Sequence, residues 1–152
     1  MPALLIVHGV IAAALLGAVT HQALSVLRGS ADRNGSFLER YAGVRPRSFT
    51  APIAILYVVN VGIGAVLYPS YRLNVRTPLE EMSLAWAIGL FELKEHFGGI
   101  GLGVLPLYVY TWRAERADSH RRDRIVLTIL LALIVWWNFI IGHVVNNIRG
   151  LP

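Results

Sequence analysis

Four long apolar stretches follow one another along this chain of 152 residues, and they constrain its fold more than any other feature. They cover residues 3–27, 51–68, 84–112 and 125–148. Each reaches or approaches the roughly 20 residues that an α-helix needs to cross the hydrocarbon core of a bilayer. The sequence therefore predicts an all-α integral membrane protein, a single multi-pass transmembrane domain over residues 1–152 that forms an up-down-up-down four-helix bundle.

The composition excludes most other classes of protein. Hydrophobic residues make up 55% of the chain and charged residues only 15%, which is more apolar side chain than a soluble domain of this size can bury. The chain has no cysteine, so disulfides, thiolate zinc sites, iron–sulfur clusters and covalently attached haem are excluded. Walker A, G-x-S-x-G and H-E-x-x-H motifs are missing, and whether the chain is an enzyme stays open.

The arginines set the expected orientation in the membrane. Ten of the 13 arginines lie in the connections 28–48 and 113–124, whereas the other side has only Arg72, Arg76 and Arg149. Positive charge concentrates in short cytoplasmic loops, so we expect both connections in the cytoplasm and both termini on the outer side. This placement fits the lipid bilayer as partner and argues against nucleic acid. The arginine richness also suggests a GC-rich genome and a bacterial cytoplasmic membrane.

The connection between the second and third stretches carries boundary signals. Tyr68-Pro69 is expected to end the second helix, because proline cannot continue a regular hydrogen-bond pattern. Thr77-Pro78, with Glu80 three residues after Thr77, is typical of a helix start capped by the threonine hydroxyl. The third helix is therefore predicted to begin outside the bilayer.

Ionisable residues inside a membrane span are costly, so they are functional candidates by default. The densest group occupies residues 91–97 of the third stretch. On a helix, one face collects two carboxylates, an imidazole and two glycines, while Lys94 points elsewhere. The glycines leave a flat trench that suits close helix packing or a planar ligand. The residues of this face are Glu92, Glu95, His96, Gly99 and Gly103.

Three histidines on different helices are predicted to share one depth. Counting roughly 20 residues from the cytoplasmic end of each span reaches His8, the neighbourhood of His96, and His143. We therefore expect these histidines to converge in the outer leaflet, beside Glu92 and Glu95. The alternative is an interfacial belt of polar side chains that only anchors the helices.

One further histidine stands apart from this group. His21 lies 13 residues after His8, which puts it roughly 20 Å deeper along the same helix. No other spanning histidine shares its level, and its role stays open.

Three functions fit the predicted cluster. The first, which we favour, is a b-type haem on His8, His96 and His143 for electron transport, with a quinone or a partner membrane subunit as the redox partner. The second is a single transition-metal ion on the same histidines with Glu92 or Glu95. The third needs no cofactor: the chain relays protons, or it is an accessory subunit of a larger membrane complex. The four-helix layout resembles that of small cytochrome b membrane proteins, and this likeness is architectural.

Overall fold

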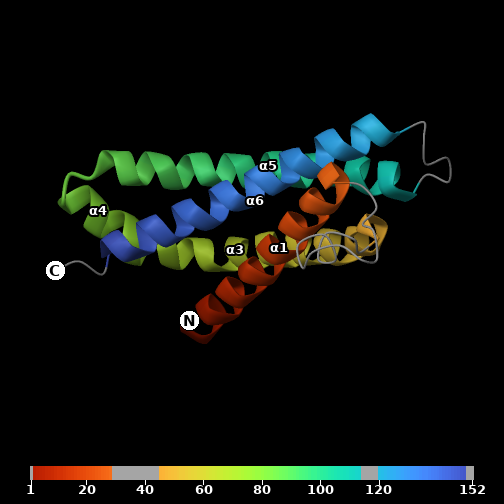
Figure 1. Cartoon of the computed structure of the whole chain (residues 1–152). Helices are drawn as coiled ribbons and strands as arrows, with labels where there is room; N and C mark the ends of the chain where they lie inside the picture. The colour runs from red at the N-terminus through yellow and green to blue at the C-terminus, as the bar shows by residue number, and fades with distance from the viewer. Residues whose placement is uncertain (1, 29–44, 114–119, 150–152) are drawn as a thin grey trace.

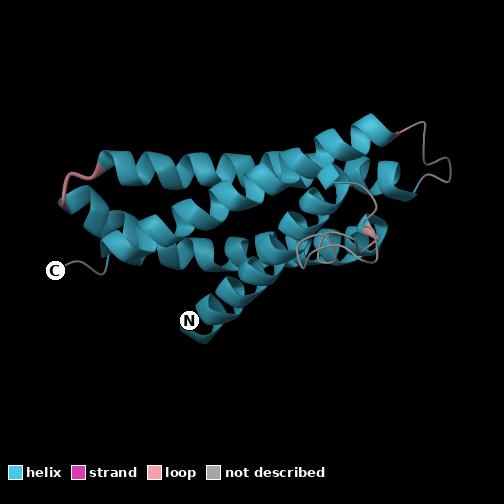
Figure 2. Cartoon of the chain, viewed as in Figure 1, coloured by secondary structure: helices cyan, strands magenta, loops and turns pink. Residues whose placement is uncertain are grey.

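The computed structural model describes residues 2–28, 45–113 and 120–149 of the chain. These residues are almost entirely helical, and none of them forms a strand (Figure 2). The predicted all-α class is thereby confirmed. The two arginine-rich connections lie mostly outside the described residues, at 29–44 and 114–119.

Four long helices dominate the structure (Figure 1). α5 packs along α6, and α1 contacts both α6 and α3, whereas the contact between α3 and α5 is lighter. The first half of α1 diverges from the other helices, and none of residues 2–14 is buried. The four helices are α1 (Pro2–Arg28), α3 (Thr50–Tyr71), α5 (Ala85–Arg113) and α6 (Arg121–Arg149).

The second helix is longer than the sequence predicts. It does not end at Tyr68-Pro69, because α3 continues through Pro69 to Tyr71. A π-helical turn, η2 (Arg72–Arg76), and the short helix α4 (Thr77–Glu81) then continue the helix without a break. The prediction that Thr77 caps a new helix is therefore wrong. Its hydroxyl instead donates back to the carbonyl of Arg72 at 3.3 Å, inside continuous helix.

Three helical stretches are long and apolar enough to cross a membrane: Pro2–Leu27, Pro46–Glu81 and Arg121–Ile148. They mark the chain as a membrane protein by length and composition. α5 is not among them, although the sequence analysis counts 84–112 as a span. The reason is that four ionisable residues occupy its first half and lower its hydropathy.

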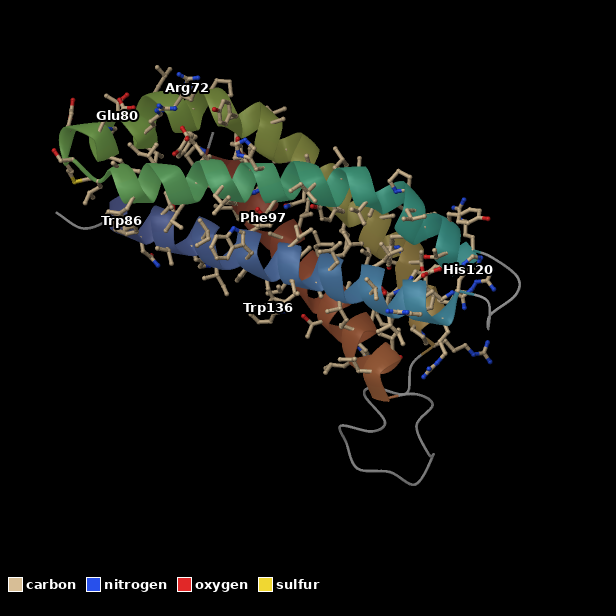
Figure 3. All side chains as sticks on the ribbon, turned by 90° about the horizontal axis from the view of Figure 1, so that it is seen from above. Arg72, Glu80, Trp86, Phe97, His120 and Trp136 are labelled. Atoms are coloured by element: carbon tan, nitrogen blue, oxygen red, sulfur yellow. The ribbon has the colours of Figure 1, made fainter. Side chains whose placement is uncertain are left out.

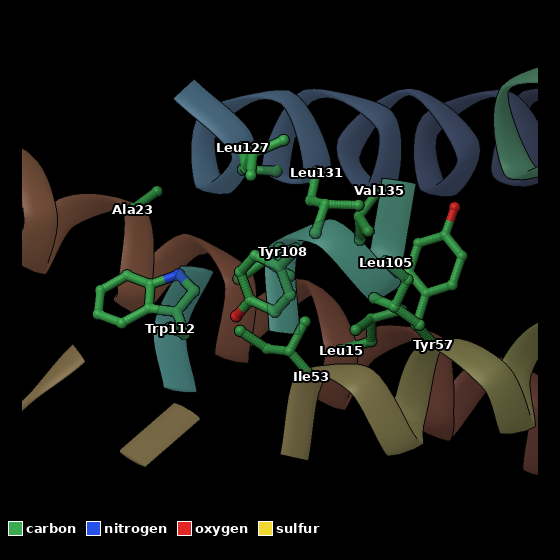
Figure 4. Close-up of a cluster of buried hydrophobic side chains, with 12 residues drawn as sticks. Leu15, Ala23, Ile53, Tyr57, Leu105, Tyr108, Trp112, Leu127, Leu131 and Val135 are labelled. Carbon is green, nitrogen blue, oxygen red and sulfur yellow. The ribbon is translucent and has the colours of Figure 1, made fainter. Parts of the chain in front are cut away.

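Two hydrophobic clusters hold the helices together. The larger one fills the half of the bundle toward the short 3₁₀ helix η1 (Pro46–Phe49) with side chains from all four long helices, among them Leu15, Ile53, Leu105 and Leu131 (Figure 4). The smaller one lies near α4, where Leu79 is completely buried. We call this the α4 end of the bundle, and the opposite end, which holds η1, the η1 end.

Candidate functional site: a polar layer inside the bundle

The rotation of α5 decides which of its ionisable residues lies inside the bundle. The buried positions Gly101, Leu105, Tyr108 and Trp112 recur every three or four residues, as in a helix that packs along one seam. The same spacing continued toward the start of the helix reaches Lys94, which is partly buried. Lys94 is therefore the charged side chain that α5 turns inward.

The face of α5 that the sequence analysis selected points away from the bundle. All five of its residues, Glu92, Glu95, His96, Gly99 and Gly103, are exposed. A methyl group added at Gly99 or Gly103 would meet nothing within 4 Å. The glycine trench is present, but the chain's own helices do not cover it.

The three predicted histidines do not point into a common space. His8 is partly buried against α3, while His96 and His143 are exposed. The Nδ1 atoms of the two exposed rings lie 2.7 Å from the carbonyl oxygen of Glu92 and 3.3 Å from that of Phe139, so each ring contacts its own helix. Among the described residues, no group of three or more His, Asp or Glu side chains could hold a metal ion. The structure thus does not gather the predicted ligand set.

Four partly buried polar residues, one on each long helix, make up what we call the polar layer. Three glycines make room for these side chains. A methyl group on Gly64 would lie 3.6 Å from His8 Cε1, and one on Gly142 would lie 3.7 Å from Lys94 Cε. A methyl group on Gly98 would lie 4.0 Å from Asn138 Oδ1. The polar layer consists of His8 on α1, Asn60 on α3, Lys94 on α5 and Asn138 on α6.

His8 connects three members of the polar layer. Its ring reaches the main-chain carbonyl of Asn60, and it is close enough to Lys94 for their charges to interact. Its Nδ1 atom is buried and has no partner, and the same is true of Asn60 Oδ1. Buried polar atoms normally have a hydrogen-bond partner. We therefore expect water or another molecule to supply the missing partners of these two atoms.

Aromatic rings enclose the polar layer on the side of α4. The Nζ atom of Lys94 lies 4.4 Å from the ring centroid of Phe91, within the range of a cation–π interaction. That ring stacks in turn on Tyr71, with centroids 3.5 Å apart and planes 9° from parallel. The hydroxyl of Tyr71 and Nε1 of Trp137 are further buried atoms without a partner at this end.

Ion pairs outside the aromatic rings fasten α4 to α5. The Nε atom of Arg76 lies 2.8 Å from Glu80 Oε1, and Nη1 of the same guanidinium lies 3.1 Å from Glu92 Oε1. Figure 3 shows Arg72 and Glu80 at this end of the molecule and His120 at the opposite end. Glu92 is thus an anchor for the α4 segment rather than a member of the interior.

A second set of buried polar residues lies at the η1 end. Tyr108 donates its hydroxyl hydrogen to Gln22 Oε1 at 2.6 Å, and Gln22 Nε2 donates to the Pro46 carbonyl at 2.9 Å. Trp112 Nε1 donates to Thr128 Oγ1 at 3.2 Å. We call these five residues the Tyr108 network. His21 also lies at this end, where its ring centroid is 4.8 Å from that of Phe49.

The sequence places Asn60 on one stripe of the second helix with Tyr57 and Gly64, but Lys94 and Asn138 were missed as interior residues. A sufficient signal was present, because continuing the three-and-four spacing of the large apolar residues on each helix includes both positions. The prediction instead chose the α5 face richest in ligating side chains.

Comparison with known proteins yields no family model, no curated protein and no solved structure that matches this chain.

Proposed function

We propose that the chain is a cofactor-free accessory subunit of a larger membrane complex, and that the outward face of α5 binds its partner. In this proposal all four long helices cross the membrane up-down-up-down, with both termini on the outer side. The observation that carries it is the exposure of Glu92, Glu95, His96, Gly99 and Gly103 on one face of a helix that packs in a membrane bundle.

This face suits contact with protein better than contact with lipid. Counting roughly 20 residues back from Arg113 puts Lys94 at the outer edge of the hydrocarbon, so Glu95 and His96 lie at that edge and the glycines lie below it. Ionisable side chains at such a depth are costly against lipid, and a small-xxx-small pair lets a second helix approach closely. The lipid-facing side of α5 is therefore best completed by another protein.

The chemistry of the face describes the partner. Glu92 is already paired with Arg76, whereas the exposed carboxylate of Glu95 is available to a cation or a hydrogen-bond donor. The partner segment is thus a transmembrane helix with small residues opposite Gly99 and Gly103 and a basic or donor side chain opposite Glu95.

The haem and metal hypotheses both require groups that the interior of this bundle does not supply. With His96 and His143 exposed, a site that uses both of them needs ligands or walls from another molecule. The polar layer offers one histidine next to an ammonium group, which repels a metal cation. The geometry therefore favours the cofactor-free reading.

We call this outward face of α5, with Glu92, Glu95, His96, Gly99 and Gly103, the docking face. A photo-crosslinking experiment in native membranes tests whether it binds a protein. The photoreactive residue replaces Ile100, which is 52% exposed beside the face, and in a control it replaces Leu133, which is 64% exposed on α6. We expect a discrete protein adduct at position 100 that is at least tenfold stronger than at position 133. Adduct at twice the chain's own mass of 16.8 kDa would make the partner a second copy.

Two glycine variants show whether the trench makes the contact. Gly103→Leu fills the trench and is expected to abolish the adduct at position 100. Gly62→Leu is the matched control, because Gly62 also has open space around it but lies on α3. Equal adduct from both variants, or only lipid adduct in the unmodified chain, would contradict the proposal.

A further inference from the structure

An apolar groove runs between α3 and α5 toward the η1 end. It is a shallow, open depression of about 680 Å³, lined mostly by α5 with Val58 from α3 at its edge. The lining is apolar along most of its length and becomes polar at one end. Its residues include Val58, Leu102, Pro106 and Val109, with Tyr110 and Arg113 at the polar end.

The groove has the length and position of a lipid chain. Leu102 and Arg113 are 11 residues apart on one helix, which corresponds to about 16 Å. The hydrocarbon of one leaflet is about 15 Å thick. An acyl chain that starts at the level of Arg113 and follows the groove therefore reaches Leu102 near the middle of the bilayer.

Positive charge is concentrated at the polar end of the groove. Arg113 lines the groove and is exposed. The guanidinium of Arg47 lies next to it, since Nη2 of Arg47 donates to the main-chain carbonyl of Arg113 at 3.2 Å. Two guanidinium groups at the end of an apolar groove complement a phosphate, and Arg binds phosphate oxygens in pairs. Basic pockets between transmembrane helices are known to take acidic lipid headgroups.

We propose that this groove is a binding site for an anionic phospholipid. The phosphate lies at Arg113 and Arg47, and one acyl chain lies along Val58, Leu102 and Pro106. The site adjoins the docking face at Leu102 and Gly103, and from there it extends along α5 to Arg113 and includes Val58 of α3. It does not depend on the proposed accessory role, so either proposal can fail without the other.

Lipid retention by the purified full chain tests this site. The chain is equilibrated in detergent micelles that contain phosphatidylglycerol or phosphatidylcholine with the same acyl chains, and bound lipid is counted by native mass spectrometry. We expect at least a tenfold preference for phosphatidylglycerol. Arg113→Gln should reduce this preference to near unity, whereas Arg121→Gln, an exposed arginine at the same end outside the groove, should leave it unchanged.

A second pair of variants separates the groove from surface charge. Leu102→Trp fills the groove and should lower retention of both lipids at least fivefold. Leu107→Trp is the control, because Leu107 is 54% exposed on the same helix and does not line the groove. Equal loss from Arg113→Gln and Arg121→Gln would overturn the proposal, and so would equal retention of the two lipids. A photoreactive residue at Val109 that captured protein in native membranes instead of lipid would also overturn it.

Discussion

At the η1 end of the bundle most of the buried polar side chains bond to one another and Thr50 Oγ1 is left without a partner, whereas at the α4 end several such atoms lack one. Tyr108, Gln22 and the Pro46 carbonyl form a continuous chain of hydrogen bonds. In the polar layer, His8 Nδ1 and Asn60 Oδ1 are buried without a partner. The Tyr108 network draws on α1, η1, α5 and α6, and the polar layer draws on α1, α3, α5 and α6.

The difference indicates that the buried polar groups of the two ends have two different roles. A network in which donors and acceptors are paired with one another stabilises one arrangement of the helices. A layer with open acceptors next to an ammonium group is stable only when water or another molecule completes it. We therefore infer that the polar groups of the η1 end stabilise the fold and that those of the α4 end interact with water or another molecule. The following predictions test this inference.

The largest effect is expected from Tyr108→Ala. The ring is completely buried, and its hydroxyl bonds to Gln22, so the substitution creates a cavity and removes a hydrogen bond. The free energy of unfolding should fall by about 3–5 kcal/mol, as for other aromatic-to-alanine changes in cores. Denaturant unfolding in micelles measures it. Tyr110→Ala, at a 63% exposed position two residues later, is the control, and an equal loss there would show that the Tyr108 network is not structural.

Gly101→Leu should have the next largest effect. The position of its side chain is occupied by the Tyr57 ring and by Ile134, so those groups must move. Tyr57 would then lose its 2.9 Å hydrogen bond to the Gly98 carbonyl, next to the polar layer. Overpacking of this kind costs about 1–3 kcal/mol. Gly103→Leu, which meets nothing within the chain, should leave the stability of the purified protein nearly unchanged, and a comparable loss would place Gly103 inside the bundle instead.

A matched pair of leucine substitutions compares the two ends directly. Gln22→Leu removes the acceptor of the Tyr108 hydroxyl and the donor to the Pro46 carbonyl, and it should cost about 1–3 kcal/mol. Asn60→Leu removes an amide oxygen that already lacks a partner, so stability should change by less than about 1 kcal/mol. Both are measured by the same unfolding titration. A larger loss for Asn60→Leu would reverse the inferred roles of the two ends.

The smallest effect is expected from the double substitution His96→Ala with His143→Ala. Because both side chains are exposed and contact only their own helices, fold and absorption spectrum of the purified chain should stay unchanged. The measurement is a reduced-minus-oxidised difference spectrum before and after the change. Sharp bands of a b-type haem that disappear in the double variant would restore the haem prediction and sink the cofactor-free proposal.

The sequence was sufficient to predict the four helices, because their length and apolar content leave no other fold. The ends of α1 and α5 agree with the predicted 3–27 and 84–112. The continuation of α3 past Pro69 was missed, since proline stops a helix only when nothing packs the following residues into place. Here Leu79, completely buried, holds the extension against α5.

The candidate site was harder to predict than the fold. Counting residues from the arginines predicted a common level for His8, His96 and His143, whereas in the structure the charged neighbour of His8 on α5 is Lys94. The prediction of which α5 residues point into the bundle was wrong, because a search for ligands favours the face with the most carboxylates and imidazoles. Packing favours the face whose neighbours are large and apolar, and on α5 that face contains Lys94.

The π-helical turn at Arg72–Arg76 has a consequence for sequence length. A π turn accommodates one residue more than an α turn, so everything after it is rotated by about 100°. That rotation turns Leu79 toward the smaller cluster and lets Arg76 reach Glu92. Deleting a single residue between 72 and 76 would restore regular α geometry and rotate α4 about the axis of α3. Homologous chains should therefore tolerate substitutions in this segment far better than a change in its length.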